Sequence, residues 1–121
     1  MKISKLILTL TAVAGLMLTM TTSSFAKSVL QDVLNGGVLK VGTTGDWNPM
    51  TMKNPATNSY SGYDIDVMTE LAKDLGVKVK FVPTDWKTLV SGVTSGKYHM
   101  TGSASVSPAR AKATGYSVSY F

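Results

Sequence analysis

The chain has 121 residues with 12 basic and 7 acidic side chains, so its formal net charge is +5 at pH 7. The basic residues are spread along the chain rather than grouped in a block, which argues against a protein that binds nucleic acid or a membrane surface. The sequence has no cysteine, which excludes disulfide bonds and cysteine zinc sites, and its one histidine cannot build a metal site alone. We therefore expect no metal, no cofactor and no nucleic-acid partner.

Residues 1–26 have the organisation of a secretory signal peptide. Lys2 and Lys5 precede an apolar stretch, and small polar residues lead to a small-x-small cleavage site that ends at Ala26. A membrane-spanning helix fits less well, because threonine and glycine interrupt the apolar stretch and it is shorter than the ~20 apolar residues that a span needs. Cleavage after Ala26 leaves residues 27–121 as one small domain and, without the two lysines, lowers the formal charge from +5 to +3.

Helix and strand patterns alternate along the mature chain. The clearest helix has apolar residues at helical spacing before Gly76, and the clearest strand alternates apolar residues with lysine until Pro83. The expected elements are, in order, a helix over 29–34 with Ser28 as N-cap and Asn35-Gly36-Gly37 as its left-handed stop, a strand over 38–42, a hairpin that pairs 50–52 with the stretch around Tyr60, a helix over 64–75, a strand over 77–82, a helix over 86–94 capped by Asp85, and a strand over 98–101.

This order of elements predicts an α/β fold with a largely parallel sheet. In such sheets, ligands bind at the carboxyl ends of the strands. The loops that follow Val41, Val82 and Thr101 would all emerge there. We therefore expect the functional residues in these three loops.

Four segments in order resemble the N-terminal part of the family 3 extracellular solute-binding proteins. They are "GVLKVGTTGDWNPM", "YSGYDIDVMTELAKDLGVKVKFVP", "WKTLVSGVTSGKYHM" and "SVSPARAKATGYSVSYF". The resemblance covers about Val29 to Phe121 and implies the first lobe of a two-lobed, type II periplasmic binding fold, so we expect residues 27–121 to be a fragment of such a protein. Within the family, "TTGDWNP" and "VPTDWKTL" are similar to the cyclohexadienyl dehydratase branch, enzymes that act on prephenate or arogenate.

Arg110 closes the stretch "SASVSPAR", residues 103–110. A guanidinium grips a carboxylate through two parallel hydrogen bonds, which lysine does not reproduce. From spacing alone, the favoured interpretation is an exposed arginine in the first turn of a short helix begun by Pro108. The resemblance favours a ligand role, because the family's carboxylate-binding arginine falls on Arg110.

Ser103 and Ser105 alternate with alanine in the same stretch. In an extended segment their side chains share one side, where hydroxyls and backbone N–H groups would complete the shell of a bound carboxylate. The alternative is an ordinary polar loop, and for Ser107 we favour a helix-capping role. The small residues also let a ligand approach the backbone closely.

Two tryptophans, Trp47 and Trp86, each follow an aspartate in the other two loops. One ring per loop would sandwich a ligand side chain or stack on a cyclohexadienyl ring, although Trp86 packing its own helix onto the sheet is an equal alternative. The resemblance implies that Asp46 contacts the far end of the ligand, and the alternative is a turn-forming aspartate beside Gly45.

The remaining chemistry-bearing residues are interpreted as structural. Asp64 and Asp66 stand at a helix N-terminus, where negative charge is favoured in any case. His99 occupies a position where the family most often has aspartate, and we assign it no role. We expect no buried carboxyl group suited to acid catalysis in this chain.

The resulting functional hypothesis is a periplasmic protein that binds an amino acid or a similar small carboxylate for an ABC transporter. The alternatives are a prephenate or arogenate dehydratase of the same fold, and a remnant without a ligand. The resemblance places the dehydratase's acid and the second lobe outside this sequence, so the enzyme remains open.

Overall fold

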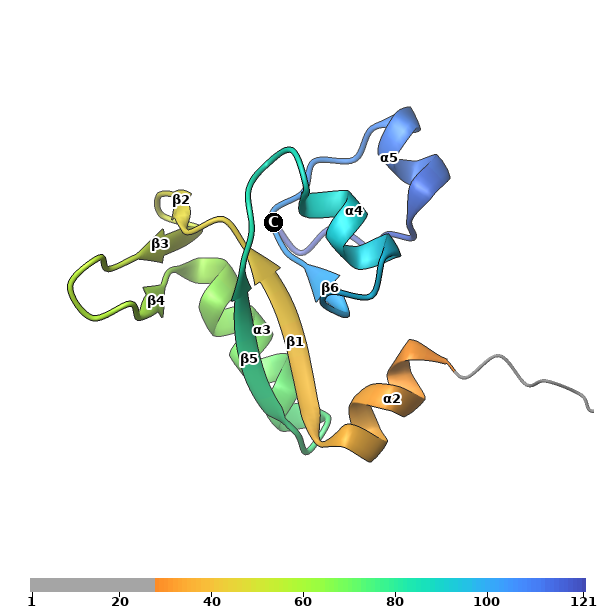
Figure 1. Cartoon of the computed structure of the whole chain (residues 1–121), viewed down its shortest axis with the longest axis horizontal. Coiled ribbons are helices and arrows are strands. Elements are labelled where there is room, and N and C mark those ends of the chain that lie inside the picture. The colour runs from red at the N-terminus through yellow and green to blue at the C-terminus, as the bar shows by residue number, and fades with distance from the viewer. Residues whose placement is uncertain (1–27) are drawn as a thin grey trace, which may run out of the picture.

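The computed structural model of the chain describes residues 28–121 (Figure 1). The predicted signal peptide, residues 1–26, lies outside the described residues. No helix within residues 28–121 combines the length and the apolar character that crossing a bilayer requires. The elements are α2 (Val29–Gly36), β1 (Val38–Thr43), β2 (Asp46–Trp47), β3 (Thr51–Lys53), β4 (Tyr60–Ser61), α3 (Tyr63–Asp74), β5 (Lys78–Pro83), α4 (Leu89–Thr94), β6 (Met100–Thr101) and α5 (Pro108–Ala113).

The main sheet has the strand order β5-β1-β6, and both neighbours of β1 run parallel to it. Val41 in β1 lies opposite Phe81 on one side and Met100 on the other. A small antiparallel sheet, β2-β3-β4, projects from the loop after β1, with Met52 opposite Ser61 (Figure 1). The predicted parallel sheet and the predicted hairpin are both confirmed.

Local capping accounts for the boundaries of α2 and α5. The Ser28 hydroxyl accepts a hydrogen bond from the Gln31 N–H at 3.1 Å, and Gly37 ends α2 with φ +66°. The Ser107 hydroxyl accepts from the Arg110 N–H at 3.3 Å, and Pro108 is the first residue of α5. The predicted capping roles of Ser28 and Ser107 are confirmed, and within the predicted stop over 35–37 the left-handed residue is Gly37.

The helix predicted over 86–94 is wrong at its start, because α4 begins at Leu89. The Asp85 carboxylate accepts from the backbone N–H groups of Lys87 and Thr88, each at 2.9 Å, and so closes a turn before the helix. The N–H of Thr88 lowers the pKa of Asp85 by stabilising its charged form. A side chain that bonds to the local backbone thus delays the helix by three residues.

Strand β1 divides the interior into two layers, because successive side chains point to opposite faces. Leu39 and Val41 pack with Met68 and Ala72 of α3. On the other face, Gly42 lies under the ring of Tyr98, where an added Cβ would come within 2.5 Å of that ring. The Tyr98 hydroxyl donates to the Leu89 carbonyl of α4 at 2.7 Å, so α3 and α4 cover opposite faces.

His99 joins β6 to β1 at its start. Its Nδ1 accepts from the Lys40 N–H and its own N–H donates to the Lys40 carbonyl, both at 3.0 Å. The predicted strand over 98–101 is shorter than expected, with β6 confined to Met100–Thr101. The ring of Tyr98 instead fills the space between β1 and α4 and is fully buried.

Candidate functional site

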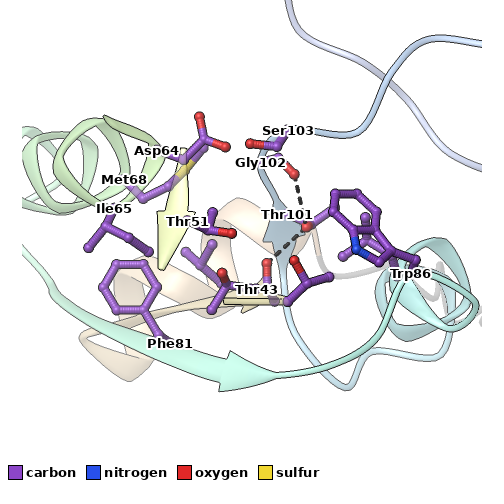
Figure 2. Close-up of a pocket in the computed structure, with 14 residues that line it drawn as sticks. Thr43, Thr51, Asp64, Ile65, Met68, Phe81, Trp86, Thr101, Gly102 and Ser103 are labelled. Atoms are coloured by element: carbon purple, nitrogen blue, oxygen red, sulfur yellow. Dashed lines mark hydrogen bonds between the residues drawn. The ribbon is translucent and has the colours of Figure 1, made fainter. Parts of the chain in front are cut away.

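A small cavity of about 10 Å³ lies at the carboxyl ends of β1 and β6 (Figure 2). Its lining combines polar side chains with apolar residues of the core. Figure 2 shows Asp64, Thr51 and Ser103 turned toward the same space, with Trp86 at its edge. The cavity therefore lies at the edge of the sheet where the sequence predicts a ligand site.

Four buried side-chain oxygens have no hydrogen-bond partner among the described residues, and all four belong to residues that line this cavity. They are the hydroxyl oxygens of Thr43, Thr51 and Ser103 and the Oδ2 atom of Asp64. The exposed fractions of Thr43, Thr51 and Asp64 are 4%, 5% and 2%. Buried polar groups in native proteins are nearly always satisfied by protein, water or ligand. A concentration of such oxygens in one cavity therefore indicates a binding site.

Asp64 is the functional candidate that the sequence analysis missed. The sequence analysis expected no buried carboxyl group suited to acid catalysis and so overlooked that Asp64 is buried, at 2% exposed, whereas Asp66 is exposed. The helical repeat explains the difference, since Asp64 stands four and eight residues before the buried Met68 and Ala72, on the same stripe of α3. That alignment was the signal in the sequence.

Burial raises the pKa of Asp64, while a hydrogen bond from Tyr120 opposes the rise. The Tyr120 hydroxyl donates to Oδ1 of Asp64 at 2.9 Å. Burial, together with the hydrogen bond to Asp64 and the charge of that residue, raises the pKa of Tyr120 to about 12. Tyr120 is therefore a constant donor at physiological pH, and it occupies one carboxyl oxygen while the other faces the cavity.

A larger hollow of about 470 Å³ adjoins the small cavity and shares Asp64, Thr101, Gly102 and Ser103 with it. The segment over 114–121 forms one of its walls. The ring of Tyr63 lies 6.3 Å from that of Tyr120, centroid to centroid, which holds the end of this segment over the start of α3. The hollow has the size of a pocket for a small metabolite, with the polar cavity in its floor.

Ser103 and Ser105 both line the larger hollow, but the extended conformation expected for their segment is wrong at Ser103. Its φ of +58° lies in the left-handed region and turns the chain over the cavity. The preceding Gly102 fits closely there, because an added Cβ would lie 3.0 Å from Oδ2 of Asp64. Ser103 is therefore a cavity residue, whereas the side chain of Ser105 is exposed.

Arg110 is half-buried and folds back toward the loop before α5. Its Nη1 atom donates to the Ser105 carbonyl at 3.0 Å, and the Tyr116 hydroxyl donates to the same oxygen at 3.3 Å. Arg110 does not line either of the two cavities described above. Its role as a carboxylate ligand stays a prediction. Ser105, which lines the larger hollow, is the residue that links Arg110 to it.

The two tryptophans contact each other. Their ring centroids are 5.5 Å apart at an interplanar angle of 66°, which leaves no space for a ligand ring between them and differs from the sandwich expected from the sequence. The Asp46 carboxylate accepts from the indole N–H of Trp86 at 3.1 Å. Trp86 lines the small cavity and Trp47 the larger hollow, whereas Asp46 lines neither of them.

The described residues contain no group of three histidine or acidic side chains that would hold a metal ion. The chemistry that the site offers is hydrogen bonding by hydroxyls, one buried carboxyl group and aromatic surface. This set suits a small polar organic molecule.

A profile of the bacterial extracellular solute-binding proteins, family 3, matches residues 39–121. The chain is 44% identical over 62 residues to the L-cystine-binding protein TcyA of Bacillus subtilis, covering 51% of this chain and 23% of TcyA. It is 33% identical over 95 residues to the cyclohexadienyl dehydratase of Pseudomonas aeruginosa, covering 78% of this chain and 35% of the enzyme.

Among solved structures, a mutant of domain 1 from TmArgBP in its arginine-bound form superposes with a TM-score of 0.69 at 26% identity. The match covers 76% of this chain and 71% of that domain. The predicted type II fold is thereby confirmed for the first lobe. The chain spans about a quarter to a third of the length of the two curated relatives. It belongs to the family 3 bacterial extracellular solute-binding proteins.

Proposed function

We propose that this chain binds an amino acid or a similar small carboxylate as the substrate-binding component of an ABC uptake system. Residues 1–26 would export it to the periplasm as a signal peptide. The observation that supports the proposal is the stretch over 103–105, whose small residues line the larger hollow, together with the hydrogen bond from the Arg110 guanidinium to the carbonyl of Ser105.

Arg110 is suited to a carboxylate because, within residues 28–121, its guanidinium makes one hydrogen bond. A guanidinium has five N–H donors, and the contact to the Ser105 carbonyl uses Nη1. The other donors remain for a bidentate pair with a carboxylate. Rotation about the long side chain, with loss of the hydrogen bond to the Ser105 carbonyl, would bring the guanidinium of Arg110 to the hollow.

The relatives support both the ligand class and a test on this chain alone. TcyA is named for L-cystine, and TmArgBP domain 1 was solved in an arginine-bound form. A single lobe of this fold can therefore retain an amino acid. The expected ligands are amino acids with a polar or charged side chain.

The test is titration calorimetry of the purified chain with a panel of amino acids and prephenate, repeated for Arg110→Met and Arg110→Lys. Losing the charged partner of a desolvated carboxylate typically costs ~3–5 kcal/mol, or roughly a hundredfold to several thousandfold in affinity. Arg110→Lys should recover part of the loss, because the point charge remains without the planar fork.

Lys112→Met is the matched control, because Lys112 is an exposed cation two residues along the same helix. We expect it to bind like the parent. The carboxylate clamp would be contradicted if Arg110→Met bound every ligand of the parent within a few-fold.

A dehydratase is the second candidate, favoured by one observation. Burial raises the pKa of Asp64, which favours the protonated form that an acid would need to assist the elimination of water from prephenate. The check is incubation with prephenate, followed by the ultraviolet absorbance of an aromatic product. Turnover that Asp64→Asn abolishes would favour the enzyme, and binding without turnover would favour the receptor.

A further inference from the structure

One bond between β1 and β6 depends on a histidine side chain. The Nδ1 atom of His99 accepts from the Lys40 N–H, and the His99 N–H donates to the Lys40 carbonyl, both at 3.0 Å. In a regular parallel ladder, the N–H of a strand donates to a backbone carbonyl of its neighbour. Here an imidazole nitrogen replaces that carbonyl, and we call this pair of bonds the His99–Lys40 link.

The link requires an uncharged imidazole. A neutral ring has one N–H donor and one acceptor nitrogen, whereas a charged ring has two donors. Because Nδ1 accepts, the ring carries its proton on Nε2. A second proton, taken from solvent by the lone pair of Nδ1, would oppose two donors and leave the Lys40 N–H without this acceptor, which is unfavourable. Histidine changes its charge between about pH 5 and pH 8, so the link is sensitive to physiological pH.

The charged groups around His99 provide no counter-charge for an imidazolium. Lys40 is the one charged residue of β1, Lys97 stands two residues before His99, and α4 has no charged side chain. His99 forms no ion pair with any of the residues 28–121. The other titratable groups that line the larger hollow are Asp64, Tyr116 and Tyr120. The surroundings thus favour the neutral ring that the link needs.

The link is continuous with the wall of the larger hollow. His99 lines that hollow itself, and β6, which follows it, has only two residues, paired with Val41 and Gly42. Gly102 and Ser103 come directly after β6 and line both cavities. A strand of two residues provides little to hold this loop in place once its first bond to β1 is lost.

We propose that His99 is a pH-sensitive positioning residue: protonation of Nδ1 breaks the bond from the Lys40 N–H and loosens the wall formed by residues 102–105. The chain then binds its ligand more tightly near neutral pH than in a mildly acidic medium. The inference rests on the proposed function and adds its regulation.

Two variants separate the charge of His99 from its packing. His99→Asn keeps an acceptor close to the position of Nδ1 but does not titrate, and His99→Phe keeps a ring without an acceptor. His99 is the only histidine of the sequence, so an effect in the histidine range that the asparagine variant lacks belongs to it. The carboxyl group of Asp64 is present in all three proteins and cancels in the comparison.

Thermal melts and NMR test the link without a ligand. The unfolded imidazole has no bond to lose and takes up the proton more readily, so the stability of the parent should fall as the pH falls. Between about pH 7.5 and pH 5.5 we expect its melting temperature to drop about 4–8 °C further than that of His99→Asn, the shift typical of one lost hydrogen bond in a small domain. The nitrogen chemical shifts of the imidazole should show an unprotonated Nδ1 at the higher pH.

Titration calorimetry with L-arginine and L-glutamine, whose charges are constant between about pH 5.5 and pH 7.5, tests the effect on binding. The parent should lose about three- to tenfold in affinity across this range, as the loss of one hydrogen bond implies. His99→Asn should keep its own affinity at both pH values. His99→Phe should bind weakly at both, because its acceptor is absent throughout.

The inference is overturned if Nδ1 carries the proton at neutral pH, if the parent binds equally well at both pH values, or if His99→Asn loses as much affinity as the parent. In each of these cases binding near pH 7.5 would leave the proposed function intact. Binding of neither probe at that pH also overturns the pH-dependent release, whereas the proposed function falls only if the wider panel of amino acids fails too.

Discussion

Leu39 and Thr43 lie four residues apart on β1 and are both almost fully buried, with exposed fractions of 3% and 4%, yet their surroundings differ in kind. Leu39 belongs to an apolar cluster with residues of α2 and α3. Thr43 borders a cavity in which its hydroxyl oxygen finds no partner among the described residues. The middle of β1 is thus packed in the core, whereas its carboxyl end has a buried hydroxyl without a partner among the described residues. This distribution is expected when a ligand binds at the end of a sheet.

The largest effect on stability is expected from a substitution that leaves a void in the apolar cluster around Leu39. Leu39→Ala leaves a void in the cluster that β1 forms with α3 and should lower the free energy of unfolding by about 2–5 kcal/mol. Urea denaturation followed by circular dichroism measures the change. Leu30→Ala, at a position 53% exposed in α2, should change it by less than about 0.5 kcal/mol. Equal effects at the two positions would show that Leu39 is not part of a packed core.

Asp64→Asn should act in the opposite direction and stabilise the unliganded chain. Because the folded-state pKa of Asp64 is raised, the folded chain keeps a proton that the unfolded chain has already released. The free energy of unfolding therefore falls as the pH rises from the ordinary aspartate pKa through the raised value. Asparagine removes this dependence and should add about 1 kcal/mol at neutral pH.

Tyr120→Phe tests the same carboxyl group, because it removes the hydrogen bond that stabilises the charged form of Asp64 and lowers its pKa. It should make the fall of stability with pH steeper, while Asp64→Asn makes it shallower. Thermal melts between pH 4 and about pH 8 compare the three proteins. Lower stability of Asp64→Asn at neutral pH would show that the carboxylate stabilises the unliganded fold. That result would contradict the interpretation of Asp64 as a ligand-binding residue.

The smallest effect distinguishes two threonines that line the same small cavity. The Thr101 hydroxyl donates to the Gly42 carbonyl at 2.8 Å, so Thr101→Val should cost about 1 kcal/mol. The Thr51 hydroxyl has no partner among the described residues, so Thr51→Val should stay within about 0.5 kcal/mol of the parent. The same denaturation assay measures both. Equal costs would show that Thr51 is held by a bond as strong as that of Thr101.

The elements with local causes could be predicted from the sequence alone. Hydrophobic spacing and end signals predict α3 and β5 closely, and the caps at Ser28, Gly37 and Ser107 occur as predicted. The order of the elements was enough for the parallel arrangement of β1, β5 and β6. The family resemblance rested on the same short segments, and the profile match over 39–121 confirms it.

Which polar residues come together depends on the tertiary structure and could not be predicted from the sequence. Thr43, Thr51, Asp64 and Ser103 come from four separate segments, and nothing in their spacing requires that they surround one cavity. The left-handed turn at Ser103 and the contact between Trp47 and Trp86 likewise depend on how the loops pack on one another. Burial is a property of the whole fold, so the same helix N-terminus that exposes Asp66 buries Asp64 and gives it a raised pKa.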